Sequence, residues 1–387
     1  MEPRTDKIIG LNRNVFFLGV TSFFNDFSSE MLFSVLPAFF ITVLETGAAS
    51  LGLVEGVCEG FSNLTKIYSG GLSDKLRRKK ILVVAGYALS VATRPLYTFV
   101  AHVPSAFGLR FVDRAGKGLR DAPRDALISL SSSAEEMGKS FGYHRAMDTV
   151  GAILGPLLGY LILKDFPQEF RLVFLSSFGL GILASVSLLF VTDIAGSFAP
   201  PLLRFNSSHG FSTQFKLYLL SILILSAGSL PIAVLLLKTQ SVGLMIYSIP
   251  LFYTVYNLSY AALSVTAGRM SDKIGTGYLI IVGYMVLVLS YAALFLAHSA
   301  FSLVISFLML GLFPAFTDGV QRAHTARITT EEQRGGAYGL INAMSGFGAM
   351  AAGIAGGYLW QVFGPGIALL TGATTVILGL LLFIATN

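Results

Sequence analysis

Charged residues are scarce in this chain of 387 residues: Asp, Glu, Lys and Arg together make up 12% of it, whereas hydrophobic residues make up 54%. Soluble domains contain about 25% charged residues, so this composition excludes an ordinary soluble domain. The sequence therefore predicts a protein that is embedded in a membrane.

Cysteine is almost absent, since Cys58 is the single one, and this excludes an internal disulfide. No HExxH motif occurs, and the segment GKG at 116–118 is not a phosphate-binding loop, because Phe111 stands at the position of the first glycine and Gly118 at that of the Ser or Thr. No nucleophile has a base at a convincing spacing. We therefore expect a protein that is not an enzyme, with no metal, no cofactor and no ATP-driven step.

Long apolar runs, in contrast, recur along the whole chain. About 20 residues are enough to cross a bilayer that is ~30 Å thick. We predict an all-α polytopic membrane protein with twelve transmembrane helices. The spans are placed at 15–44, 50–69, 81–101, 105–124, 140–163, 171–192, 215–237, 241–267, 277–297, 299–320, 335–360 and 364–385.

Positive charges fall on alternate connections between these spans. Positive residues in short loops stay on the cytoplasmic side, so we expect both termini to be cytoplasmic and the protein to lie in the inner membrane. The same bias explains the net charge of +6, and no nucleic-acid partner is needed to account for it. The basic residues of these connections are Lys75, Arg77, Arg78, Lys79, Lys80, Arg120, Arg124, Lys139, Lys273, Arg322, Arg327 and Arg334.

The sequence contains an internal repeat. The tripeptide SDK at 73–75 recurs at 271–273, 198 positions later, and the segment that begins at Gly142 matches one that begins at Gly339, 197 positions later. Repeats of six spans are typical of transporters. The expected domains are an amino-terminal six-helix bundle at 1–192, a cytoplasmic linker at 193–213 and a carboxyl-terminal six-helix bundle at 214–387.

Three motifs resemble those of one family of transporters. The loop GGLSDKLRRKK at 70–80 resembles a signature between helices 2 and 3, with Arg77 in place of its second glycine. The segment RAGKG at 114–118 resembles a helix-4 motif, and GxxxGPxxG at 151–159 resembles a helix-5 element associated with antiporters. The family is the major facilitator superfamily (MFS), and the resemblance covers essentially the whole chain. It implies two pseudo-symmetric six-helix bundles that transport by alternating access, and the helix-5 element implies the proton-coupled antiporter or efflux branch.

The resemblance also implies gating residues. The signature loop is expected to latch the cytoplasmic side, with Asp121 or Asp125 pairing with Lys75 or Arg78, although a plain topology signal is an alternative for its basic residues. The glycines of the helix-5 element share one helix face and permit close packing, for which plain helix packing is the alternative. The expected gating residues are Asp74, Lys75, Arg78, Asp125, Asp272, Gly151, Gly155, Pro156 and Gly159.

Charges inside apolar segments are the main candidates for function, because an arginine in hydrocarbon costs about 2.5 to 17 kcal/mol, depending on the method. Asp26 and Glu30 are four residues apart on one face of the first span, and Arg110, Arg114 and Lys117 form a stripe on the fourth. We expect these faces to neutralise each other and a proton on an acidic residue to release a pairing; a static ion network is the alternative. The expected proton-coupling residues are Asp26, Glu30, Glu59 and Asp148.

The second half has few charges inside its spans, so we expect an apolar, aromatic and amide-lined cavity wall there. The expected substrate-binding residues are Arg110, Asp113, Arg114, Lys117, Tyr256, Asn257 and Asn342. We predict a secondary transporter that exports a drug or metabolite in exchange for protons. Its expected partners are this small molecule, protons and the lipid bilayer, and we expect a monomer.

Two alternatives to export stay open. A proton-coupled importer of an anionic metabolite or carboxylate siderophore would hold its cargo with Arg110, Arg114 and Lys117. From another class, a channel or membrane sensor would move nothing stoichiometrically.

Overall fold

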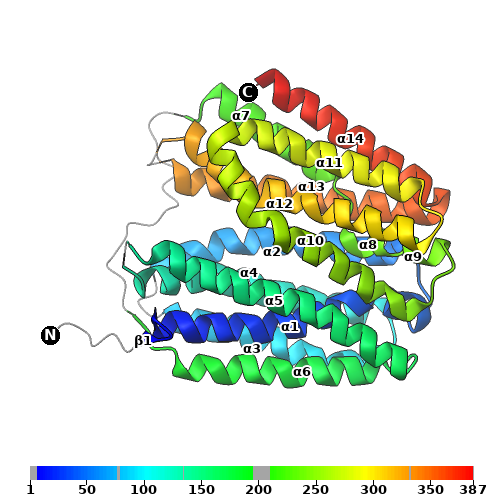
Figure 1. The fold of residues 1–387 in the computed structure, drawn as a ribbon, viewed down its shortest axis with the longest axis horizontal. Coiled ribbons are helices and arrows are strands. Elements are labelled where there is room, and N and C mark those ends of the chain that lie inside the picture. The colour runs from blue at the N-terminus through cyan, green and yellow to red at the C-terminus, as the bar shows by residue number, and fades with distance from the viewer. Residues whose placement is uncertain (1–6, 76–78, 134, 195–209, 331–332, 387) are drawn as a thin grey trace. The chain divides into compact units, whose positions relative to one another are not determined.

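A computed structural model describes residues 7–75, 79–133, 135–194, 210–330 and 333–386, without the side chains of residues 70, 71, 73–75 and 265. These ranges contain fourteen α-helices, a two-stranded hairpin and three short 3-10 turns at Tyr97–Phe99, Leu188–Phe190 and Ile246–Ser248. The helices are α1 (Arg13–Thr42), α2 (Ala48–Lys75), α3 (Lys79–Leu96), α4 (Val103–Leu130), α5 (Met137–Asp165), α6 (Phe170–Ser187), α7 (Thr213–Gly228), α8 (Ile232–Leu236), α9 (Lys238–Ser241), α10 (Ile249–Ile274), α11 (Thr276–Phe295), α12 (Ala300–Ile328), α13 (Arg334–Phe363) and α14 (Pro365–Thr386) (Figure 1).

Eight helical stretches among the described residues are long and apolar enough to cross a membrane, Phe170–Phe190 and Thr276–Phe295 among them. Helix α4 is not one of the eight, because its charged stripe lowers its hydropathy. The all-α multi-pass architecture agrees with the prediction. The count of twelve transmembrane helices stays a prediction.

The chain divides into two compact units. The amino-terminal unit comprises Met1–Val35 and Thr65–Leu202, and the carboxyl-terminal unit comprises Leu36–Leu64 and Leu203–Asn387. Helix α1 therefore begins in the first unit and ends in the second, whereas α2 begins in the second and ends in the first. The predicted linker at 193–213 stays a prediction, since most of it lies outside the described residues.

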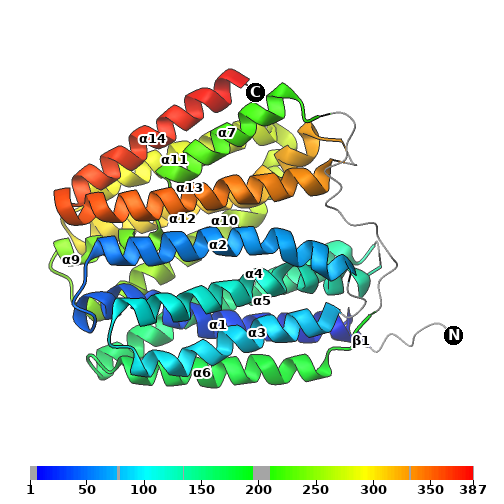
Figure 2. The same cartoon turned by 180° about the vertical axis from the view of Figure 1, so that it is seen from behind.

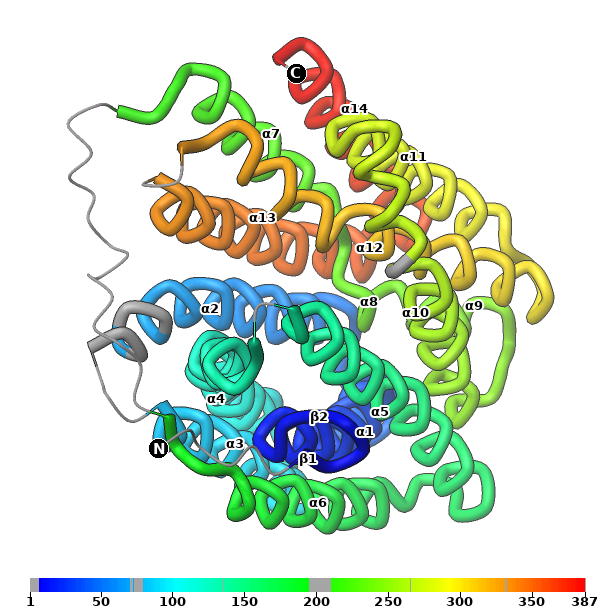
Figure 3. Tube along the Cα trace, turned by 60° about the vertical axis from the view of Figure 1, so that its left-hand side comes forward, coloured from blue at the N-terminus to red at the C-terminus, as the bar shows by residue number. Residues whose placement is uncertain are grey.

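In the amino-terminal unit, α1 lies among α3, α5 and α6 (Figure 3). The Ser28 hydroxyl of α1 donates to the Ser177 carbonyl oxygen of α6, and the two serine hydroxyl oxygens are 2.9 Å apart. Helices α3 and α4 meet at two glycines, where a Cβ added to Gly86 would lie 2.6 Å from the Gly116 carbonyl oxygen. Small residues and paired hydroxyls are the usual means of joining helices inside a membrane.

In the carboxyl-terminal unit, α13 lies beside α7 and α14 (Figure 2). It also meets the first part of α2 through glycines on both helices. A Cβ added to Gly52 would lie 2.9 Å from Gly357 Cα, and one added to Gly56 would lie 2.8 Å from Gly353 Cα. This contact therefore depends on the absence of side chains at these positions.

Two predicted spans differ from the observed helices. The span predicted at 215–237 is interrupted after Gly228, and the chain resumes as α8 after Pro231, which has no N–H to donate. The helix predicted from residue 241 begins at Ile249, after a turn in which Gly243 has a φ of 75°. Both differences come from backbone chemistry that an average of hydropathy does not register.

A short hairpin precedes α1. Strand β1 (Lys7–Ile8) pairs antiparallel with β2 (Leu11–Asn12), and the two turn residues Ile9 and Gly10 have φ values of 48° and 75°. Positive φ at both central residues is the signature of a type I′ turn. The hairpin is linked to the start of α5, because Lys139 Nζ donates to the Gly10 carbonyl oxygen at 2.8 Å.

An ion pair outside the membrane-spanning segments makes a second link. Lys7 Nζ of the hairpin donates to Glu136 Oε1 at 2.6 Å, just before α5 begins. The hydrogen bond and the charge of Lys7 hold the pKa of Glu136 below its ordinary value of 4.5. Such a carboxyl group contributes stability above the unfolded-state pKa and loses it as the pH falls through the lowered folded-state pKa.

Glu136→Gln is therefore expected to lower the melting temperature at neutral pH, and the difference from wild type should shrink as the pH falls below 4.5. The expected decrease is no more than about 2 °C, because exposed ion pairs contribute little. Thermal unfolding in detergent across a pH series measures it. Glu135→Gln, at the exposed neighbouring carboxyl group, is the matched control. An equal decrease in that control, or a difference that persists in acid, contradicts the assignment.

Candidate functional site

Helix α4 places a stripe of charged side chains inside the amino-terminal unit. Arg110 and Arg114 are 2% and 9% exposed, and Asp113 Oδ2 accepts a hydrogen bond from Arg110 NH1 at 3.1 Å. Both guanidinium groups lie near the Phe33 ring of α1, at 4.8 Å and 5.7 Å from its centroid. Contacts of this kind stabilise a cation by about 0.5–2 kcal/mol. The stripe therefore faces α1.

The acidic residues of α1 lie at the same place, around a cavity of about 10 Å³. A cavity of roughly 10–15 Å³ holds one water molecule, so a metabolite does not fit. The cavity is lined by Asp26, Ser29, Glu30, Phe33, Arg110, Asp113, Arg114, Lys117 and Arg120. We call this group the charged cluster. The structure thus brings Asp26 and Glu30 together with the basic stripe, and the roles assigned to these residues stay predictions.

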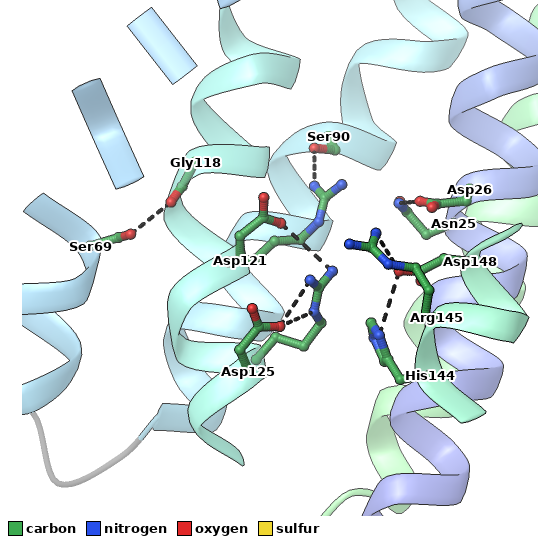
Figure 4. Close-up of polar contacts among 12 residues, drawn as sticks. Asn25, Asp26, Ser69, Ser90, Gly118, Asp121, Asp125, His144, Arg145 and Asp148 are labelled. Carbon is green, nitrogen blue, oxygen red and sulfur yellow. Dashed lines mark hydrogen bonds and ion pairs between the residues drawn. The ribbon is translucent and has the colours of Figure 1, made fainter. Parts of the chain in front are cut away.

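A hydrogen-bonded chain holds Asp26 in this cluster. Asn25 Nδ2 donates to Asp26 Oδ1 at 3.0 Å, and Arg94 NH2 of α3 donates to Asn25 Oδ1 at 2.9 Å (Figure 4 shows Asn25 and Asp26). Arg94 is 1% exposed. It is missing from the predicted site, although it is the one charged residue in the apolar run 81–101 and the argument made for α4 applies to it equally.

Asp148 of α5 is a second buried carboxylate in the same unit. It is 9% exposed, and its Oδ2 lies 3.5 Å from His144 Nδ1 and 4.0 Å from Arg145 NH1 (Figure 4). A carboxylate is stable in such a place only when it is paired or protonated. His144 and Arg145 supply such a pairing for Asp148, and its predicted coupling role stays a prediction.

Arg120 and Arg124, which the topology prediction counts among the basic residues of a connection, lie inside α4, because α4 continues to Leu130. The end of a helix does not place the membrane boundary, so the predicted topology stays a prediction. Arg120 is 4% exposed, donates to Ser90 Oγ of α3 at 2.7 Å and lies 4.5 Å from the Tyr87 ring centroid. Pairing within the protein lets the helix extend past charges that hydropathy assigns to a loop.

Two of the three aspartates predicted to act in gating contact arginines. Asp125 Oδ1 lies 3.0 Å from Arg124 NH2 (Figure 4 labels Asp125), and Asp272 Oδ1 of the carboxyl-terminal unit lies 3.7 Å from Arg327 NH2. Asp121, the alternative partner in the predicted latch, has its Oδ1 3.7 Å from Arg124 NH1. The predicted latch residues on the signature loop lie outside the described residues. These are Arg78 and the side chains of Asp74 and Lys75.

The glycines of the helix-5 element lie against α1. A Cβ added to Gly151 would lie 2.9 Å from the Phe27 backbone nitrogen, and one added to Gly155 would lie 2.5 Å from the Phe27 carbonyl oxygen. Gly159 follows one turn later, and Pro156 is buried within the same helix. The element therefore brings α5 into backbone contact with the helix that bears the acidic residues of the charged cluster.

A larger cavity, of about 390 Å³, lies within the carboxyl-terminal unit, and we call it the carboxyl-terminal cavity. Pockets for small molecules usually measure about 300–1,000 Å³. Tyr256 and Glu59 line it, whereas Asn257, which is buried, and Asn342, which is half-buried, are not among its described lining residues. Lining residues that the sequence did not single out for binding include Asn63, Tyr284, Asp318 and Gln321.

Comparison with known proteins identifies the family. The sequence model of the Major Facilitator Superfamily matches residues 18–252 and 217–387. An uncharacterized MFS-type transporter of Methanocaldococcus jannaschii is 34% identical over 386 residues, which cover 97% of this chain and 95% of the relative. Multidrug resistance protein MdtH of Salmonella paratyphi C matches at 27% identity over 37% of this chain and 35% of that protein.

Solved structures agree in fold. The peptide transporter POT superimposes with a TM-score of 0.82 at 14% identity, covering 98% of this chain and 95% of that one. The nucleoside transporter NupG gives a TM-score of 0.77 at 15% identity, covering 96% and 98%. These likenesses show the fold alone. The family match and the relative of nearly the same length define a multi-pass membrane transporter and not an enzyme. The chain belongs to the Major Facilitator Superfamily, as its sequence motifs predicted.

Proposed function

We propose that the chain is a secondary active transporter that works by alternating access and exports a small molecule in exchange for protons. The observation that supports this best is the charged cluster, in which acidic residues of α1 share a cavity with basic residues of α4. Ionisable residues within membrane spans are rare, and they mark substrate and ion pathways and proton relays.

A proton changes the balance of this cluster. Its three acidic and four basic side chains have a formal charge of +1, and protonation of Asp26 or Glu30 raises it to +2. Like charges repel strongly where the dielectric constant is low, so the protonated cluster favours a conformation in which water reaches the basic residues. A proton thereby shifts the equilibrium between inward-open and outward-open states, because it binds the two states with different affinity.

Helix α1 offers a path for this shift. It is one continuous helix from Arg13 to Thr42, with Asp26 in the amino-terminal unit and Pro37 in the carboxyl-terminal unit. A displacement at Asp26 is therefore passed along the same helix into the second unit. The glycine face of α5 favours such a displacement, since no side chain of α5 interlocks with α1 at Gly151 or Gly155.

Export and membrane orientation rest on further observations. The helix-5 element at 151–159 supports antiport, and the partial likeness to a multidrug resistance protein points the same way. Basic residues on alternate connections support an inner-membrane protein with both termini in the cytoplasm. We propose a monomer as the transporting unit.

Proton-coupled import of an anion is the second candidate, and the net positive charge of the cluster favours it. The cavity of the charged cluster, however, has room for one water molecule, so a carboxylate cargo does not fit beside the basic residues. Export with a proton-coupling role for the cluster is therefore preferred.

Proteoliposomes with a trapped pH-sensitive dye test the proposal. Drugs, sugars, carboxylates and metal chelates are added in turn under an imposed pH gradient. We expect at least one compound to show saturable flux against proton flow, and a protonophore to abolish it. Flux that does not saturate and continues without the gradient indicates a channel. Entry of an anion together with protons indicates the importer.

A further inference from the structure

We infer that the carboxyl-terminal cavity is the cargo pocket and that it takes an organic cation with an apolar or aromatic body. The inference rests on the proposed transport function in one respect only: the occupant of the cavity is a cargo if the protein transports it. Cargo and proton are then held in different places, the cation in the carboxyl-terminal cavity and the proton in the charged cluster.

The charge of the cavity wall is the first argument. Glu59 of α2 and Asp318 of α12 line the cavity, and none of its described lining residues is Lys, Arg or His. Asp318 Oδ2 accepts a hydrogen bond from Tyr260 at 3.2 Å, which holds this carboxylate in place. The charged residues that line the cavity are thus both carboxylates, and a wall of this sign disfavours an anionic occupant and favours a cationic one.

The aromatic residues of the wall are the second argument. Tyr284 of α11 and Phe313 of α12 have ring centroids 5.0 Å apart with their planes at 60°, and Tyr256 of α10 lines the same cavity. Gln321 Nε2 donates to the Tyr284 hydroxyl at 2.9 Å and fixes the ring. Aromatic faces attract desolvated cations by up to about 2 kcal/mol, and they also accept an apolar body.

The break between α7 and α8 is the third argument, because Ser229 and Leu230 of this break line the cavity. The Tyr291 hydroxyl bridges it, donating to the Gly228 carbonyl oxygen at 3.1 Å and accepting from Leu230 N–H at 2.8 Å. Broken helices mark substrate sites in transporters. The end of α7 presents the negative pole of a helix of 16 residues, whereas α8 has only five, so the net dipole also favours a cation.

Charged thiol reagents test this inference without knowledge of the natural cargo. Ser345→Cys places a thiol in the cavity wall, and the full-length protein is treated in detergent with a trimethylammonium-ethyl or a sulfonato-ethyl methanethiosulfonate. We expect the cationic reagent to react at least about tenfold faster than the anionic one, since a cleft lined by one sign of charge concentrates counter-ions by 10–10³. Ser241→Cys, at an exposed position, gives the intrinsic ratio of the reagents. Wild-type protein, whose Cys58 is buried, gives the blank.

Removal of the carboxylates completes the test. Glu59→Gln with Asp318→Asn should bring the ratio at Ser345→Cys down to that at Ser241→Cys, and each single variant should lower it in part. Three outcomes at Ser345→Cys overturn the inference: the two reagents react at equal rates, the anionic reagent reacts faster, or neither reagent reacts. These outcomes count even if the double variant fails to fold. Labelling needs no pH gradient. Cation-selective labelling without any transport therefore contradicts the proposed function alone, and proton-driven transport without selective labelling contradicts the cation pocket alone.

Discussion

Replacing Asp26 by asparagine is expected to lower proton-driven transport strongly while leaving exchange of the substrate across the membrane intact. Asparagine has nearly the same shape as aspartate and still accepts the hydrogen bond from Asn25 Nδ2 through its side-chain oxygen. It neither binds nor releases a proton, so the charge of the cluster no longer changes during the cycle. The initial rate of driven flux should fall by a factor of about 5–150, the range that corresponds to coupling free energies of 1–3 kcal/mol.

The measurement needs two assays on the same proteoliposomes. Flux under an imposed pH gradient reports coupling, and exchange of labelled for unlabelled substrate at equal pH reports binding and conformational cycling. Asp165→Asn is the matched control, because Asp165 is an exposed carboxylate at the end of α5 and outside the charged cluster. If the Asp26→Asn variant retains the driven flux of the wild type, Asp26 has no part in the coupling mechanism. The same experiment on Glu30, Glu59 and Asp148 then decides among the other carboxylates that were predicted to couple protons.

The amino-terminal part of the candidate site was largely predictable, because the physical signal is local. A charge within an apolar run must find a partner or water, and the spacing of Asp26 and Glu30 assigned them to one helix face. The same rule, applied to Arg94, would have placed this residue in the predicted site as well. Arg120 lies within the predicted span 105–124 but was counted only as a basic residue of a connection, because the pairing that buries Arg120 against α3 is a property of the folded protein.

The carboxyl-terminal cavity was beyond such local rules. Glu59 and Asp318 lie on α2 and α12, far apart in the sequence, and no periodicity in either helix indicates that they line one cavity. Only their packing shows that the electrically quiet second half has a negatively charged cavity wall. The helix break beside the cavity did have a local signal, since Pro231 lies within the predicted span 215–237.

Gly155→Ala is expected to destabilise the protein and to stop transport, because α1 and α5 are in backbone contact at this residue. The added Cβ would lie 2.5 Å from the Phe27 carbonyl oxygen and 2.8 Å from the Met31 backbone nitrogen. Neither atom is free to rotate away, so the helices must separate. Overpacking of this kind usually costs about 1–3 kcal/mol, and contact with backbone places this case at the upper end. For a chain of this size the melting temperature should fall by roughly 3–4 °C.

Gly142→Ala on the same helix is the matched control, since a Cβ at Gly142 has no atom within 4 Å. Alanine favours a helix over glycine by up to about 1 kcal/mol, so this variant should melt at or slightly above the wild-type temperature and transport normally. Equal melting temperatures for the two variants would show that α1 and α5 tolerate separation, and the close glycine contact would then be incidental to the fold. A stable Gly155→Ala that has lost transport would place the contact in the conformational change itself, since alternating access then requires the two backbones to meet at this turn.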